Sequence, residues 1–173
     1  QESAESQVTL DSTKCRINPH VCLLRTSQEL LIRNSDPIGD GLKVDTFRNS
    51  PINLVLAEGA EVTHDFRNPE RMPARVSCPI HPWESGWLLI QSHPYMAVSD
   101  TQGQFQIKGL PVGKWTFQFW QEKAGYLSDV TIHDQRESWR RGILELDLEP
   151  GNRDLGEIIV QPTSGLVTSE DGG

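Results

Sequence analysis

The sequence contains no long apolar run. Among its 173 residues, no stretch reaches the roughly 18 consecutive apolar residues that mark a membrane-spanning helix, so no membrane span is predicted. Basic residues are also few, since 16 Lys and Arg face 24 Asp and Glu and the formal net charge is −8. Because no basic stripe offsets this acidity, the sequence argues against a nucleic-acid partner.

Cysteine is scarce, and its count is odd. The three residues are Cys15, Cys22 and Cys78, which cannot form a complete disulfide framework. In an oxidising compartment, one disulfide could join Cys15 to Cys22 or to Cys78 and leave one thiol free. Three free thiols agree with the count equally well, so the sequence leaves both arrangements open.

An initiator methionine and the familiar catalytic motifs are missing as well. The chain starts at Gln1, as a mature protein does after removal of a signal peptide, although a trimmed chain would look the same. We therefore expect a periplasmic or extracellular protein. The sequence has no Gly-x-Ser-x-Gly, no phosphate-binding loop and no His-Glu-x-x-His, so we expect no enzyme activity.

What the sequence does have is a nearly continuous β pattern. Short alternating apolar runs are separated by Gly, Pro, Asn and Asp, and no long helical period occurs. The runs of the first half are "VCLLR", "ELLIR", "PINLVLAEG", "EVTHDF", "ARVSC" and "GWLLIQ". In "ARVSC", the period of two places Ala74, Val76 and Cys78 on one face, so Cys78 is predicted to point inward. The predicted fold class is all-β, a sandwich or Greek-key barrel.

The second half continues this pattern. Phe105 and Ile107 predict one strand, "GLPVG" predicts a turn, and Trp115, Phe117 and Phe119 predict the returning strand. "ILELDLEP" and "GEIIVQP" predict two further strands, whereas "HDQRESWRRG" leaves a loop and a helical turn equally open. The sequence therefore predicts a second β region.

The predicted organisation has three parts. Residues 7–92 form a Greek-key β-sandwich domain, and residues 93–162 form a second small β-sandwich or an extension packed on the first. Residues 163–173, "TSGLVTSEDGG", are predicted to be a disordered tail because they are polar and rich in glycine and serine.

The stretch "VSCPIHPWESGW" carries the strongest chemical signal. Cys78 and His81 are separated by two residues at the end of a predicted strand, so both side chains can reach one position. A type 1 copper site needs a thiolate and two imidazoles with a weak axial ligand, and a Cys-x2-His loop supplies half of that set. The upstream loop "NSDPIGDG", which also follows a strand, would have to supply another ligand.

The order of these stretches resembles a known family. Within residues 15–90, the series "CRINPH", "NSDPIG", "CPIHPW" and "GW" resembles the cupredoxins, especially the bacterial plastocyanin-like proteins of the methylamine-utilisation type. The resemblance implies a cupredoxin-like fold, copper as the cofactor, metal binding or electron transfer as the function, and a periplasmic redox protein as the partner.

The sequence departs from this family at two ligand positions. The resemblance places the first copper histidine where Asp40 stands and the axial methionine where Glu84 stands, so only Cys78 and His81 carry over. Carboxylates make the donor set harder, which allows a tetragonal copper site or a zinc site. The candidate metal ligands are therefore Cys78, His81, Asp40 and Glu84. The alternative is a site that has lost its metal and is filled by hydrogen bonds.

The second half resembles a different family. "AVSDTQGQFQIKGLPVGKWTFQFWQEKAG" is similar to the carboxypeptidase regulatory-like module, which also forms the middle β-sandwich of rhamnogalacturonan lyases. This resemblance implies a fold rather than a function, and no catalytic residue carries over. Some modules of that family bind carbohydrate, which makes a glycan a candidate partner.

A metal-free function follows from these departures. In this alternative, the chain is a β-sandwich module that binds a protein partner or a glycan through exposed aromatic side chains. The candidates are Trp83, Trp87, Trp120 and Trp139, each of which could instead belong to a core.

Overall fold

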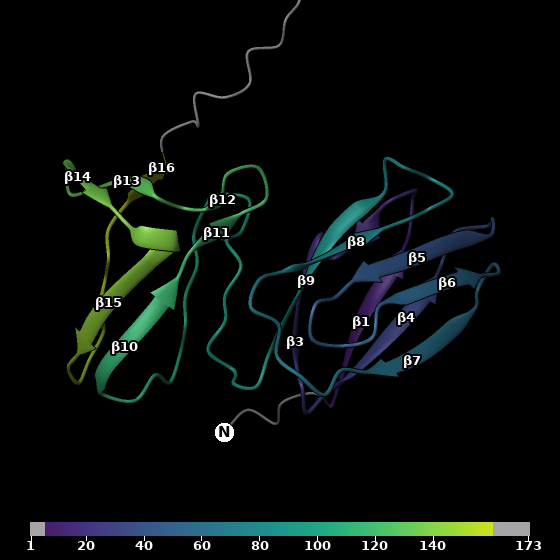
Figure 1. Cartoon of the computed structure of the whole chain (residues 1–173), viewed down its shortest axis with the longest axis horizontal. Coiled ribbons are helices and arrows are strands. Elements are labelled where there is room, and N and C mark those ends of the chain that lie inside the picture. The colour runs from purple at the N-terminus through teal and green to yellow at the C-terminus, as the bar shows by residue number, and fades with distance from the viewer. Residues whose placement is uncertain (1–5, 161–173) are drawn as a thin grey trace, which may run out of the picture. The chain divides into compact units, whose positions relative to one another are not determined.

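The computed structural model describes residues 6–160, and the chain divides into two compact units, residues 1–108 and residues 109–173 (Figure 1). Residues 92–112 contain no strand, and both this division and the boundary expected after residue 92 fall at or within that stretch. The predicted domains, 7–92 and 93–162, stay a prediction. The tail predicted for residues 163–173 lies outside the described residues.

The first unit is built from two β-sheets (Figure 1). One sheet has the strand order β2-β1-β4-β7 and the other has the order β3-β9-β8-β5-β6. The first sheet consists of β1 (Gln7–Ser12), β2 (Ile17–Asn18), β4 (Glu29–Asn34) and β7 (Glu61–Asp65). The second consists of β3 (Val21–Arg25), β5 (Asp40–Asp45), β6 (Ile52–Leu56), β8 (Ala74–Ser77) and β9 (Ser85–Gln91). Two pairs are parallel, β1 with β4 and β3 with β9, and the other neighbours are antiparallel.

A single apolar core joins these two sheets. Its buried residues come from strands of both sheets, which makes the unit a β-sandwich. The alternation of β4 shows why the sequence folds this way, because Leu30 and Ile32 are fully buried whereas Leu31 between them is only half-buried. Cys78 is 3% exposed, so the prediction that it points inward is confirmed.

The second unit also consists of strands. Its sheets have the orders β10-β15, β11-β12 and β14-β13-β16. The strands are β10 (Gly113–Gln118), β11 (Trp120–Gln121), β12 (Gly125–Tyr126), β13 (Asp129–Ile132), β14 (Gln135–Ser138), β15 (Ile143–Leu148) and β16 (Ile158–Val160). Between residues 6 and 160, the one helical element is the 3-10 turn η1 (Arg140–Gly142), and no helix in this range could cross a membrane. The all-β prediction is confirmed.

One predicted strand of the second half is wrong. Phe105 and Ile107 lie in no strand, and Phe105 is 43% exposed. The strand β10 pairs instead with β15, so that Phe117 lies opposite Leu144. Alternating apolar residues indicate a strand with one buried face, but they do not determine which segment becomes its hydrogen-bonding partner.

Residues 133–142, for which the sequence allows either a loop or a helical turn, contain both a strand and a turn. It holds the strand β14 and the turn η1. Between β13 and β14, His133 and Asp134 both have positive φ values, 49° and 60°, as in a two-residue hairpin turn. Trp139 follows β14 and is 4% exposed in the core of this unit, so it is not a surface aromatic.

Candidate metal centre

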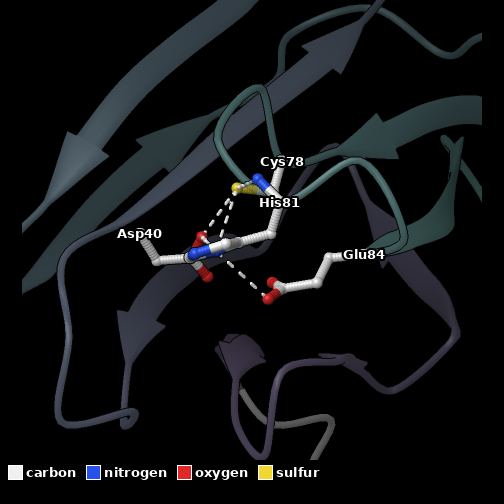
Figure 2. A group of neighbouring side chains, drawn as sticks. All are labelled: Asp40, Cys78, His81 and Glu84. Atoms are coloured by element: carbon white, nitrogen blue, oxygen red, sulfur yellow. Dashed lines mark hydrogen bonds and ion pairs between the residues drawn. The ribbon is translucent and has the colours of Figure 1, made fainter.

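Four side chains from two segments of the first unit lie together (Figure 2). Asp40 is the first residue of β5, whereas Cys78, His81 and Glu84 belong to the connection between β8 and β9. Each offers one donor atom, and these atoms all lie within 4.8 Å of one another. The side chain of His81 is 15% exposed and the other three residues are buried. The structure thus brings together the residues that the sequence singled out.

The connection between β8 and β9 is closed by its own backbone. The amide of Cys78 donates to the carbonyl oxygen of Glu84 at 3.1 Å, and the amide of Glu84 donates to the carbonyl oxygen of His81 at 2.9 Å. The connection also packs tightly on β5, because a Cβ atom on Gly41 would lie 2.8 Å from the Cδ atom of Pro79. Gly41 therefore lets Cys78 approach Asp40.

The sulfur of Cys78 is held by several polar groups. Its thiol donates to Asp40 Oδ1 at 2.7 Å, and its Sγ atom accepts the amides of His81 at 3.1 Å and Ile80 at 3.3 Å. Burial raises the pKa of the Cys78 thiol, and its hydrogen bond to Asp40 raises it further. Without a cation, the thiol therefore keeps its proton. A bound cation would favour the thiolate.

The two carboxylates have opposite pKa shifts. Burial alone would raise the pKa of Asp40, but hydrogen bonds with Cys78, Ser12, the Gly41 amide and His81 outweigh it and lower the pKa to about 2. Burial and the neighbouring Asp40 carboxylate raise the pKa of Glu84 to about 7. Near neutral pH, the pair therefore holds a proton that a cation can displace.

Two buried carboxylate oxygens in this group stand outside the hydrogen bonds described above. Asp40 Oδ2 and Glu84 Oε2 are buried and have no hydrogen-bond partner within 3.5 Å among the described residues. Among the described residues, the side chain of basic type that lies against these carboxylates is His81, whose Nδ1 is 3.1 Å from Asp40 Oδ1 and 3.3 Å from Glu84 Oε1 (Figure 2). Buried charge without a partner is costly, so this group fits a metal ion.

Asn34 is a supporting residue that the sequence reading missed. It is fully buried at the end of β4, and its Nδ2 donates to the carbonyl oxygens of Ile38 at 2.7 Å and Leu56 at 3.2 Å. Its Oδ1 accepts the amide of Asp36 at 3.1 Å. These bonds shape the loop that leads to Asp40. A polar side chain at an inward position of an alternating strand was the available signal.

The cysteines and tryptophans differ in exposure. All three cysteines are free thiols, with Cys22 in the core and Cys15 exposed.

Trp83 is 68% exposed, and its ring centroid lies 5.3 Å from that of His81. Trp139 is buried, so the prediction that it could bind a partner as an exposed aromatic side chain is wrong.

Comparisons with known proteins gave matches among solved structures only. No protein-family model and no curated protein matches the chain. The chain is similar to the Cu-containing nitrite reductase from Thermus scotoductus SA-01, with 19% identity over 48% of this chain and 22% of that chain and a TM-score of 0.44. It is also similar to two mutant forms of amicyanin, one in the Cu(I) state and one reduced, each with 11% identity over 51% of this chain and 86% of that chain and a TM-score of 0.44.

Proposed function

We propose that the first unit is a cupredoxin-like metal-binding domain with an altered copper site. Cys78, His81, Asp40 and Glu84 would hold the ion, and the proposal is carried by the two buried carboxylate oxygens that lack partners beside a thiol and an imidazole. The ordered stretches that resemble cupredoxins agree with this proposal. The sequence-based candidates and the geometric group are the same four residues.

The donor set favours holding the ion over passing electrons. When bound, copper supplies one-electron exchange between Cu²⁺ and Cu⁺. Hard carboxylate oxygens favour Cu²⁺, whereas soft thiolate and thioether ligands favour Cu⁺. Because carboxylates stand where the family has imidazole and thioether, the Cu²⁺ form would be stabilised and electron transfer would be weakened. Zn²⁺ is the competing ion, since it accepts thiolate, imidazole and carboxylate together.

A partner would approach the exposed side of His81. Ile80 and Trp83 flank this histidine in the sequence and are 49% and 68% exposed. Apolar and aromatic side chains around a partly exposed ligand suit a protein partner. We propose that a periplasmic redox or copper-carrying protein docks here, and the expected periplasmic or extracellular location belongs to the same proposal. The resemblance of the second half to carboxypeptidase regulatory-like modules, and with it glycan binding, stays a prediction.

Metal analysis of copper-loaded protein tests the binding. The unaltered chain and its Cys15→Ser variant are loaded with Cu²⁺, because the exposed Cys15 thiol can itself react with copper. After gel filtration, we expect at least one copper per chain and, in the Cys15→Ser background, a thiolate-to-copper absorption band that Cys78→Ser abolishes. His81→Gln should weaken binding at least tenfold, whereas His93→Gln is the matched control at an exposed histidine outside the group and should leave it unchanged.

Two glycines offer a second matched pair. Gly41→Ala should weaken copper binding, because its Cβ would displace Pro79 and with it Cys78. Gly39→Ala should leave binding intact, since a Cβ there meets only ordinary contact with the Leu56 carbonyl oxygen at 3.8 Å. A protein that retains no copper after loading, or an absorption band that survives Cys78→Ser in the Cys15→Ser background, would rule out the proposed site.

A further inference from the structure

A second group of donor atoms adjoins the first. Cys15, Asp36 and Glu84 each offer one donor atom, and these atoms all lie within 4.8 Å of one another. Cys15 is exposed, whereas Asp36 is 7% and Glu84 is 1% exposed. Glu84 belongs to both groups, so its carboxylate lies within 4.8 Å of donor atoms from each of them. The two groups together form one continuous set of donors.

Cys15 is placed by an unusual hairpin turn. β1 and β2 are joined by Thr13 to Arg16, and the two central residues, Lys14 and Cys15, have φ values of 54° and 55°. Such a turn favours asparagine and glycine, so a lysine and a cysteine here carry a conformational cost. The carboxylate of Asp36 offsets this cost by accepting the amides of Lys14 at 2.6 Å and Cys15 at 2.8 Å.

The unpartnered oxygen of Glu84, which also supports the first site, indicates a ligand near this second group. Glu84 Oε1 faces His81 Nδ1, but Oε2 is buried without a hydrogen-bond partner within 3.5 Å among residues 6–160. In the same range, the structure pairs no lysine or arginine side chain with Asp36 or Glu84. Two buried carboxylates thus lie beside a thiol, and a metal ion would give Glu84 Oε2 the partner that it lacks.

We propose that Cys15, Asp36 and Glu84 form a second metal position, which takes Zn²⁺ or a similar divalent ion, with Glu84 bridging it to the first. One thiolate and two carboxylates are ligands that Zn²⁺ accepts, and a water molecule would complete its usual set of four. Binding exchanges the S–H proton of Cys15 for a sulfur–metal bond and releases that proton to solvent. The proposal depends on the proposed function only through Glu84, which both positions share.

Titration of the whole chain with Co²⁺ tests the second position. Co²⁺ is the probe because its bonds to thiolates give an absorption band that reports each sulfur ligand. We expect two Co²⁺ per chain for the unaltered protein, one for Cys15→Ser and one for Cys78→Ser. Cys22→Ala is the matched control, because Cys22 is buried in the core and belongs to neither group, and it should leave the count at two.

The Glu84→Gln variant distinguishes a metal site formed by Cys15, Asp36 and Glu84 from binding by the Cys15 thiol alone. If Cys15 binds Co²⁺ only as an exposed sulfur, this substitution leaves the Cys15-dependent band unchanged. In a shared site, the affinity at both positions falls at least tenfold. Cys15→Gly guards against misfolding, because glycine relieves the positive φ while it removes the thiol. This variant should be at least as stable as the parent and should still lose one Co²⁺.

The outcomes distinguish this proposal from the proposed function. One Co²⁺ per chain that Cys15→Ser leaves in place overturns the second position and supports the first. One Co²⁺ per chain that is lost in Cys15→Ser but kept in Cys78→Ser supports the second position and overturns the first. No bound Co²⁺ overturns the second position. The same result would show that the first position does not take Co²⁺, and the copper experiment would then decide whether that position binds copper. A Cys15-dependent band that Glu84→Gln does not weaken also overturns the bridged site.

Discussion

The two units of this chain bury very different amounts of apolar surface. Among residues 6–160, the core of the first unit contains fifteen buried residues drawn from two sheets, whereas that of the second contains four. Every buried polar or charged residue among the described residues lies in the first unit. These residues are Ser12, Asn34, Asp36, Asp40, Glu70 and Glu84. A buried carboxylate is costly, so it is found where a large core supplies stability to offset it.

The difference shows how a core makes a site possible. Asp40 and Glu84 are 2% and 1% exposed, and they keep this position because strands of the sandwich fix both ends of each connection. In the second unit, the paired strands β10 and β15 contain no fully buried residue. A sheet that is only half-buried cannot hold charges away from water. We therefore expect the metal chemistry of the described residues to lie in the first unit.

The largest effect should come from opening the larger core. Leu24→Ala removes a fully buried side chain of β3, and we expect it to cost about 2–5 kcal/mol of the first unit's unfolding free energy. Leu146→Ala, at a half-buried position of β15, is the matched change and should cost about 1 kcal/mol. Urea unfolding followed by hydrogen exchange would report each unit separately. Equal costs at the two positions would contradict the contrast between the cores.

A smaller effect should appear in the pH dependence of the metal-free first unit. Glu84 has a pKa of about 7 in the folded protein and an ordinary value of 4.5. As the pH rises from 4.5 to 7, the unfolded chain gives up this proton while the folded unit keeps it, so the unfolding free energy falls, by about 1–3 kcal/mol. The pKa of Asp40, lowered to about 2 from 3.8, adds stability that is lost only as the pH falls from 3.8 toward 2.

The control for this pH effect is Glu84→Gln. Glutamine does not titrate, so the variant should lose the decrease between pH 4.5 and pH 7, measured as urea midpoints in the presence of a chelator. The second unit has no buried carboxylate among its described residues, and its transition should move less over this range. A decrease of unchanged size in Glu84→Gln would assign the effect to other groups.

The smallest perturbation uses the cysteines as probes, since all three lie in the first unit. Burial raises the pKa of the Cys22 thiol to about 12, and the residue is fully buried. Cys15 is exposed, so iodoacetamide at pH 8 should label Cys15 in the native protein and spare Cys22. In urea, labelling of Cys22 should follow the unfolding of the first unit, as peptide mapping by mass spectrometry would show. Equal labelling of the two in native protein would contradict a closed core.

Much of the fold could be read from local patterns. The period-two alternation predicted the strands around Leu30 and Ile32 and the inward direction of Cys78, because burial on one face of a sheet leaves this signature. The same alternation failed for Phe105 and Ile107. Strand formation there needed a neighbouring ladder, and β10 takes its ladder from β15. Pairing between distant segments leaves no mark in a short window of sequence.

The sequence by itself determined the all-β class and the four candidate ligands, since alternation and residue order are local properties of the chain. Only the tertiary structure decided what surrounds those ligands. Three features depend on which segments meet in space. They are the carboxylate oxygens of Asp40 and Glu84 that lack hydrogen-bond partners, the hydrogen bonds of Asn34, and the short distances from Glu84 to Cys15 and Asp36. Burial and hydrogen bonding are properties of packed neighbours, and these neighbours are brought together by the fold rather than by adjacency along the chain.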